Sequence, residues 1–353
     1  MKSVFIILKI DGLKQVFTVG IRARLLPRRD QPGHSEGGFF VDETIGKRIS
    51  DWVNAHMERI VGLTADLVRC RTVNRVAEGT EREAQLLLYG MWSKMRLETR
   101  LYSPEEAPGF RDHPAYYPGK DYADRPNVVG VWRGTGQGRS LIFSSHIDTG
   151  AVAPRWSSSP WEPRLEHGRL YGLGAFDMKG GLAASVMAVQ CLMELGFRPA
   201  GDVILESVVD EEFGGANGTL AGRLMGYNAD AAIIPEPSNL VVCPATRGGA
   251  MWRLTFRGNT GLSFSGETLR NPLNDAARFI VYLERFEKER SARGGPAPWY
   301  ETDGELPVIF TRAEAGDLSS PLSDVGPERC ELDVWVECHP GETEQPLIRS
   351  IVD

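Results

Sequence analysis

The sequence predicts an α/β protein with a second, smaller α+β domain, and three observations support this. Segments typical of strands alternate with segments typical of helices between residues 127 and 236. From residue 250 the pattern changes to strand, helix, strand, strand and helix. The chain of 353 residues also exceeds what one hydrophobic core usually organises, which favours two domains.

The first predicted elements are two amphipathic helices. Between residues 51 and 70, apolar residues recur at helical spacing, namely Val53, Met57, Ile60, Val61 and Leu67. Residues 81–95 give a second helix. Residues 1–45 hold a short strand-like start followed by several arginines, and we predict that they form an irregular N-terminal extension.

The central part of the chain reads as strands that each lead into polar residues. Residues 127–132 and 140–145 are predicted strands joined by a Gly-rich turn. A long, Ala-rich helix over residues 180–195 follows, and then come buried strands at 202–209 and 231–234. Open α/β sheets place their sites just past the carboxyl ends of strands, so these polar residues are candidates for a site.

The last hundred residues have a different order of elements. Strands are predicted at residues 252–256, 307–312 and 330–337, with helices at 274–289 and 342–351. This order fits a layer of helices on a small sheet.

Composition and charge exclude several classes of protein. The chain is 42% hydrophobic and 25% charged, which is typical of a globular protein. Its net charge of −7 and lack of a basic stripe argue against a nucleic-acid partner and leave a small molecule as the expected one. The apolar run at residues 4–8 is too short for a signal peptide or a membrane span. Five dispersed cysteines without a Cys-x-x-Cys motif fit free thiols in a reducing cytoplasm.

Six residues between positions 146 and 236 could bind metal or transfer protons: His146, Asp148, Asp177, Glu211, Glu212 and Glu236. His146 and Asp148 lie two apart at a strand end, so their side chains leave an extended chain on the same face. A carboxylate there can fix the tautomer of the ring. Glu211 and Glu212 are adjacent, and neighbouring side chains on an extended or irregular backbone diverge.

The residue types suit a metal-dependent hydrolase. Zinc takes imidazole and carboxylate ligands, and a catalytic site leaves a position open for water. Two ions roughly 3.5–4 Å apart can share a carboxylate, lower the pKa of water toward about 7 and polarise a carbonyl group. A further carboxylate is then needed to carry a proton to the leaving amine.

The order, spacing and flanking residues resemble the dinuclear zinc aminoacylase and deacylase family, which includes acetylornithine deacetylase, succinyl-diaminopimelate desuccinylase and glutamate carboxypeptidase. The motifs are YGLGAFDMKGG at residues 171–181 and VDEEFGG at residues 209–215, and the resemblance covers roughly residues 55–353. Taken alone, His146-x-Asp148 also fits a hydrogen-bonded pair, the acidic triplet at residues 210–212 a solvated turn, and Asp177 a helix N-cap. Their joint occurrence in the order of the family favours the site.

The resemblance implies two zinc ions, with cobalt as an alternative, held by His146, Asp177, Glu212 and Glu236. His146 and Glu236 would bind the first ion and Glu212 the second. Asp177 would bridge both ions, and its peptide bond to Met178 would be cis.

Two further residues would be catalytic by the same resemblance. Asp148 would orient His146, and Glu211 would be the general base. The implied activity is zinc-dependent hydrolysis of an amide bond in an N-acyl amino acid or small peptide, as in acetylornithine deacetylase. A dipeptidase of the same family, or a non-catalytic, degenerate hydrolase that binds one metal ion or a small ligand, stays open as an alternative.

The resemblance also implies an architecture. A catalytic domain with a mixed sheet and helices on both faces would span residues 46–246, and a ferredoxin-like lid or dimerisation domain would span residues 247–353. A homodimer would form through the lid. The family's last small-domain strand and its last ligand, a histidine, would lie beyond residue 353. The chain is therefore expected to be truncated at its C-terminus, with a weakened second metal site and impaired hydrolysis.

Overall fold

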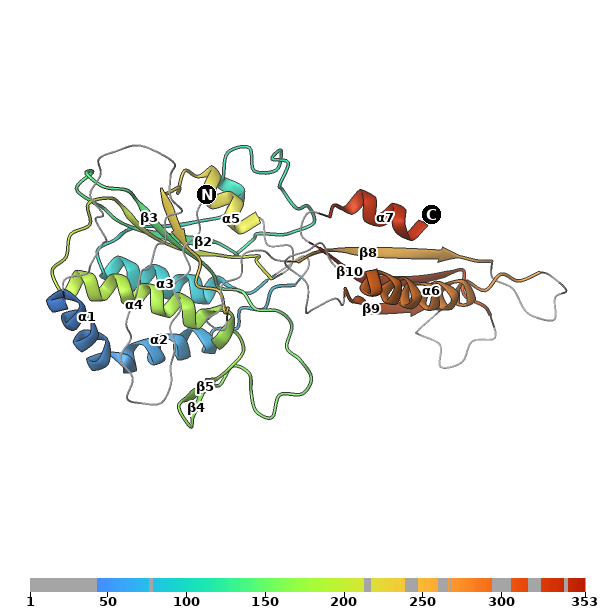
Figure 1. Ribbon diagram of the computed structural model, residues 1–353, viewed down its shortest axis with the longest axis horizontal. Coiled ribbons are helices and arrows are strands. Elements are labelled where there is room, and N and C mark those ends of the chain that lie inside the picture. The colour runs from blue at the N-terminus through green and yellow to red at the C-terminus, as the bar shows by residue number, and fades with distance from the viewer. Residues whose placement is uncertain are drawn as a thin grey trace. The chain divides into compact units, whose positions relative to one another are not determined.

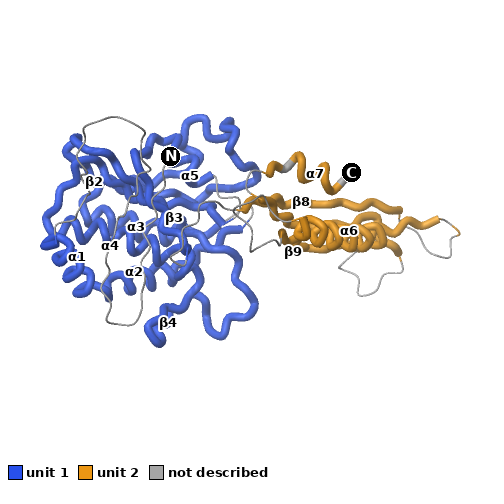
Figure 2. The backbone as a smooth tube through the Cα atoms, viewed as in Figure 1, with its two compact units in different colours: residues 1–242 blue, residues 243–353 orange. Residues whose placement is uncertain are grey.

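The computed structural model describes residues 43–75, 79–212, 217–238, 247–259, 266, 268–293, 306–316, 325–339 and 342–352 (Figure 1). Nearly all of the predicted N-terminal extension, residues 1–45, lies outside this part of the chain. The chain divides into two compact units, residues 1–242 and residues 243–353 (Figure 2). Among the described residues, no helix has the length and apolar character needed to cross a lipid bilayer.

The helices of the first unit largely follow the apolar periodicity. They are α1 (Glu43–Ala55), α2 (Met57–Arg69), α3 (Arg82–Lys94), α4 (Gly180–Glu194) and α5 (Asn217–Leu224). The prediction of one helix over residues 51–70 was wrong, because the chain breaks at His56, where the backbone leaves helical geometry. The apolar spacing continues across this break, so periodicity could not reveal it.

The sheet of the first unit is mixed. Its strands are β1 (Glu98–Tyr102), β2 (Asn127–Trp132), β3 (Leu141–His146), β6 (Val203–Val208) and β7 (Ala231–Ile233), in the order β1-β2-β6-β3-β7. β3 runs parallel to both β6 and β7, whereas β2 is antiparallel to β1 and β6. Strand β6 therefore lies between β2 and β3, although these two follow one another in the sequence.

Helices cover both faces of this sheet, as the sequence predicted (Figure 1). Gly130 on β2 lies against Trp92 of α3, and its partner across the ladder is Leu205 of β6. The next residue of β6, Glu206, instead pairs with Arg223 of α5. Because successive side chains on a strand point to opposite faces, α3 and α5 lie on opposite sides.

Shorter elements connect these layers. A 3-10 turn, Pro104–Glu106, follows β1, and a small hairpin is formed by β4 (Arg164–Glu166) and β5 (Arg169–Tyr171). A turn at Ala175–Lys179, in which the backbone of Asp177 and Met178 is not helical, leads directly into α4.

The second unit is a two-layer α+β structure. Its strands β8 (Gly248–Arg257), β9 (Val308–Ala315) and β10 (Arg329–Cys338) form an antiparallel sheet in the order β8-β10-β9. The helices are α6 (Pro272–Arg293) and α7 (Glu344–Val352). These five elements confirm the predicted order.

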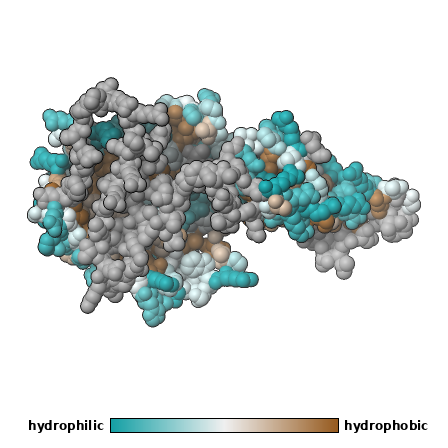
Figure 3. All heavy atoms as spheres, viewed as in Figure 1, coloured by the Kyte–Doolittle hydropathy of each residue, from teal (hydrophilic) through white to brown (hydrophobic). Residues whose placement is uncertain are grey.

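One face of the second sheet forms the core of this unit. Leu283 and Phe286 of α6 pack with Val334 of β10 and with Leu347 of α7. The side of the unit seen in Figure 3 is mostly hydrophilic, as expected for a helix that buries one face and exposes the other.

Candidate metal centre

The imidazole of His146 lies at the carboxyl end of β3 and is buried, with 2% of the residue exposed. Its Nδ1 is 3.0 Å from the backbone oxygen of Asp148. A carbonyl oxygen can only accept, so Nδ1 carries the proton in this contact and the lone pair of the neutral ring lies on Nε2. Nε2, the nitrogen that could bind a metal ion, therefore faces away from this carbonyl group.

Carboxylates converge on this Nε2 atom. It lies 3.1 Å from Oδ1 of Asp177, 3.5 Å from Oε1 of Glu236 and 3.9 Å from Oε2 of Glu211. His146, Asp177 and Glu212 also each offer one ligand atom within 4.8 Å of the others. The structure thus brings together all of the predicted ligands.

The sheet topology explains this convergence. In the parallel pair β3 and β6, His146 stands opposite Val208, so the chain that leaves β6 delivers Glu211 and Glu212 to the same edge. Strand β7 runs parallel to β3 on its other side, and Glu236 follows three residues after its end. The ligands meet at the carboxyl ends of the parallel strands.

Asp177 reaches the centre from the turn Ala175–Lys179, where its own backbone is not helical. The Asp177–Met178 peptide bond is cis, as the resemblance predicted. The Sδ atom of Met178 accepts a hydrogen bond of 3.2 Å from the backbone N–H of His146. Buried Lys179 donates to the carbonyl oxygens of Leu67 and Cys70 at 2.8 and 3.2 Å. Both neighbours on the C-terminal side of Asp177 are therefore fixed.

The carboxylate of Asp148 makes contacts that the sequence did not suggest. Its Oδ2 accepts hydrogen bonds from the backbone N–H groups of Glu211 and Glu212, at 2.9 and 3.0 Å, and from Asn74 at 2.8 Å. Its Oδ1 is 3.6 Å from Nδ1 of His146 and has no hydrogen-bond partner in the described part of the chain. Asp148 thus fixes the backbone of the glutamate pair as well as contacting the histidine.

The pKa values reflect this crowding of acidic groups. Burial alone would lower the pKa of His146, but its hydrogen bonds to Asp177 and Glu236 and the charge of Asp148 raise it to about 11. The hydrogen bond from His146 lowers the pKa of Asp177. Burial raises the pKa of Glu211, and it raises the pKa of Glu212 to about 7 with help from neighbouring carboxylates.

This arrangement fits a divalent cation. Several partly exposed carboxylates face one imidazole nitrogen, and their like charges repel one another unless an opposite charge compensates them. Imidazole nitrogen and carboxylate oxygen are also the donors that zinc takes in catalytic sites.

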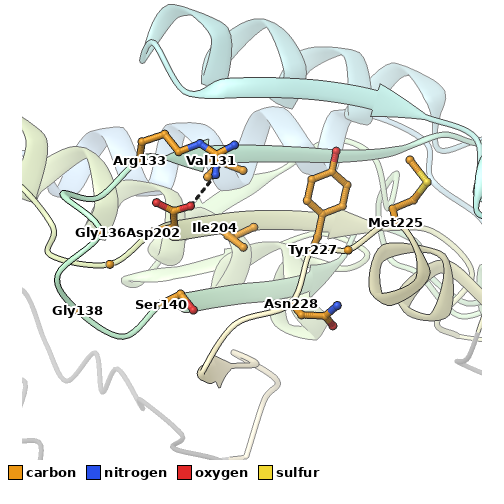
Figure 4. Close-up of a pocket in the computed structure, with 12 residues that line it drawn as sticks. Val131, Arg133, Gly136, Gly138, Ser140, Asp202, Ile204, Met225, Tyr227 and Asn228 are labelled. Atoms are coloured by element: carbon orange, nitrogen blue, oxygen red, sulfur yellow. Dashed lines mark hydrogen bonds and ion pairs between the residues drawn. The ribbon is translucent and has the colours of Figure 1, made fainter.

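A cavity of about 400 Å³ lies at the other end of the sheet, where β3 and β6 begin (Figure 4). Arg133 in its wall forms an ion pair with Asp202 at 2.6 Å, and the backbone N–H of Ser140 donates to Asp230. None of the predicted site residues lines it. The chemistry suggested by the sequence therefore lies at the carboxyl ends of the strands.

Comparison with known proteins decides the family. Residues 142–352 match the family described as Peptidase family M20/M25/M40. The chain belongs to this family. The matched range of this M20 protein includes the whole candidate centre except Asn74, and the resemblance to the dinuclear metal deacylases is confirmed.

One curated relative of this M20 protein is the N-formyl-4-amino-5-aminomethyl-2-methylpyrimidine deformylase of Bacillus subtilis. It is 35% identical over 248 residues, which are 66% of this chain and 56% of that enzyme. A deformylase of the same name from Halalkalibacterium halodurans is 30% identical over 249 residues, or 65% of this chain and 55% of that enzyme. The chain thus spans little more than half the length of these relatives.

A solved structure shares the fold at much lower sequence identity. The di-peptidase Dug1p of Saccharomyces cerevisiae superposes with a TM-score of 0.60 at 12% identity, over 86% of this chain and 74% of that one. This similarity concerns the fold alone.

Proposed function

We propose that this M20 protein is a metal-dependent hydrolase that cleaves an amide bond in a small molecule. The observation that carries the proposal is the convergence of Asp177, Glu211 and Glu236 on Nε2 of His146. The named activity of the Bacillus subtilis relative, a deformylase, is also the cleavage of a bond between an acyl carbon and nitrogen.

The ions that we propose are zinc. His146 and Glu236 would hold one ion, Glu212 the other, and Asp177 both. When bound, they would polarise the substrate carbonyl group and make water more acidic. The donor set supports this choice, because one imidazole and several carboxylates suit zinc better than they suit a soft thiolate-binding metal.

Glu211 is the residue that we propose for proton transfer. Its side chain is 43% exposed, lies within 3.9 Å of the histidine nitrogen and makes no closer contact with it. Loss of part of its hydration raises the pKa of this partly exposed carboxyl group, which brings it nearer to the working range of a general base. It would take a proton from water and return it to the leaving nitrogen.

Two kinds of substrate are candidates. An N-acyl amino acid or small peptide, with N-acetylornithine as a specific example, is the class that the motifs suggested. An N-formylated aminomethylpyrimidine is favoured by the 35% identity to the deformylase. Both classes contain an amide bond, so the same centre could act on either.

The test is an assay of the purified, zinc-loaded chain against three substrates, with Glu211→Gln as the control. These are N-acetylornithine, a dipeptide and an N-formyl aminomethylpyrimidine. Release of the free amine from one of them, lost in the variant, would support the proposal and identify the class. Tight zinc binding without turnover of any amide would instead support a non-catalytic protein that binds a metal. Absence of both zinc binding and turnover would refute the proposed function.

We also propose that residues 247–353 serve as a lid and dimerisation domain, and that the protein is a homodimer. The two-layer architecture of the second unit supports this reading. Sedimentation of the purified chain would check it, since a monomer at micromolar concentration contradicts the dimer.

A further inference from the structure

A buried amide lies behind the metal centre, between two carboxylates. Nδ2 of Asn74 donates to Oδ2 of Asp148 at 2.8 Å and to Oδ1 of Asp210 at 3.2 Å. The three residues are 0%, 0% and 2% exposed, respectively. Two carboxylates at this depth repel one another, and an amide donor shared between them offsets part of that repulsion.

The other end of the same amide fixes its direction. Oδ1 of Asn74 accepts a hydrogen bond of 3.1 Å from Arg125, which also holds Glu81 through two contacts of 2.7 and 2.9 Å. A guanidinium group can only donate and an ionised carboxylate can only accept, so only one orientation of the amide satisfies both sides. Backbone pairing adds to this, because the N–H of Asn74 donates to the carbonyl of Thr149 at 2.9 Å.

Asp210 is held from a second direction. Nζ of Lys120 lies 2.6 Å from its Oδ1, and the hydroxyl of Tyr122 donates to its Oδ2 at 2.6 Å. The side chains of Lys120 and Asp210 are 1% and 2% exposed, so this ion pair is fully buried. Asp210 also has a φ of 66°, which turns the chain sharply just before Glu211.

These contacts form one continuous path to the glutamate pair. Asn74 holds Asp148, whose Oδ2 accepts the backbone N–H groups of Glu211 and Glu212. Asn74 also holds Asp210, the residue that precedes them. The segment 210–212 is therefore fixed through its backbone by Asp148 and through the side chain of Asp210, and Asn74 contacts both of these carboxylates.

We infer that Asn74 is a positioning residue that sets the placement of Glu211 and Glu212, with Lys120 and Tyr122 supporting it through Asp210. The effect of Asn74 on metal binding and proton transfer rests on the proposed function. The effect of Asn74 on the backbone of residues 210–212 does not, so an experiment can test the positioning role separately from the proposed function.

The experiment measures hydrogen exchange by mass spectrometry on metal-free protein, in peptides that contain residues 210–212. Asn74→Asp keeps the size of the side chain but replaces both donors with a third carboxylate. Ser144→Ala is the matched control, because it also removes a hydrogen bond to a buried carboxylate of this sheet, that of Glu206. We expect the amides of Glu211 and Glu212 to exchange at least about tenfold faster in Asn74→Asp and unchanged in Ser144→Ala.

Unchanged exchange at these two amides in Asn74→Asp, or equal acceleration in Ser144→Ala, would overturn the inference. Should Asn74→Asp fail to fold, Tyr122→Phe decides, since it removes a hydroxyl that donates to Asp210 and accepts from Asn217. Faster exchange at Glu211 and Glu212 in that variant supports the positioning role, and full protection contradicts it.

Zinc titration provides the second readout. Loss of a hydrogen bond to a residue beside the metal ligands typically weakens metal affinity 10–100-fold. We expect Asn74→Asp to weaken zinc affinity at least tenfold and Ser144→Ala to leave it unchanged. A wild-type chain that neither binds zinc nor hydrolyses an amide would refute the proposed function, while the exchange result would still decide the role of Asn74.

Discussion

At the scale of single residues, the adjacent glutamates receive different roles. Glu211 is proposed to transfer a proton and Glu212 to bind metal, although both follow the same strand and both donate their backbone N–H to Asp148. A pair of matched substitutions can separate these roles.

We expect Glu211→Gln to lower kcat by roughly 10²–10⁴-fold while leaving zinc content unchanged, because it removes a proton carrier and not a ligand. Glu212→Gln should instead weaken zinc binding by at least about tenfold. Steady-state kinetics and metal analysis of the two variants check this. Equal loss of zinc from both would show that the assignment within the pair is wrong.

The ligand types could be proposed from the sequence because each stands in a short local motif. Asn74 could not, because its partners Asp148 and Asp210 are 74 and 136 residues away along the chain. A sequence shows which side chains can donate or accept, but such long-range pairing depends on how the strands assemble. The same reason hid the second role of Asp148.

At the scale of elements, the turn before α4 is fixed by a lysine that sequence reasoning left without a role. Lys179 fills a fully buried position and donates to two carbonyl oxygens near the end of α2. Burial lowers its pKa to about 8. It joins α2 to the segment that carries Asp177.

We expect Lys179→Met to destabilise the protein by about 1–3 kcal/mol, because the carbonyl groups of Leu67 and Cys70 would lose their donor. Urea denaturation measures the change in the free energy of unfolding. A variant as stable as the wild type would mean that water or a neighbouring group replaces the ammonium.

The first turn of α4 also packs closely against the chain that carries Glu236. A Cβ atom at Gly181 would lie 2.2 Å from the carbonyl oxygen of Pro235. We therefore expect Gly181→Ala to cost roughly 1–3 kcal/mol of stability and to weaken zinc binding. Gly62→Ala in α2 is the control, since a Cβ there meets nothing within 4 Å. This substitution should increase the stability of the protein by about 0.5–1 kcal/mol. Equal stabilities of the two variants would contradict this reading.

The type of most elements could be predicted from the sequence, whereas the pairing of the strands in the sheet could not. The predicted helices at residues 81–95 and 180–195 are α3 and α4, and the buried strands are present. The insertion of β6 between β2 and β3 has no local signal, because consecutive strands joined by a short turn usually pair. Strand β1 was also missed.

At the scale of the whole molecule, the fold and the family agree. The first unit carries the predicted mixed sheet and the second the predicted strand and helix order. These large features were readable because they depend on periodicity, which survives in a single sequence, and not on specific contacts.

Metal binding should stabilise the first unit as a whole. Zinc at about 100 times its dissociation constant would add about 2.7 kcal/mol, which corresponds to a rise of roughly 5–10 °C in Tm. Thermal unfolding with zinc and with a chelator checks this. The Glu236→Gln variant should show a smaller rise, and an identical rise would place the ion elsewhere.

The central position of β6 has a consequence for the order of folding. Strands β2 and β3 leave a gap in the sheet that closes only when β6 enters it, and only then do residues 210–212 come near His146. Such non-local pairing is slow, because the entropy of closing long loops is lost before the strands form stabilising contacts. The ion would therefore find its full set of ligands only after the barrier to folding has been crossed. Stopped-flow measurements should show that zinc slows unfolding and leaves the refolding rate nearly unchanged. The metal would then stabilise the completed sheet and not the transition state for folding.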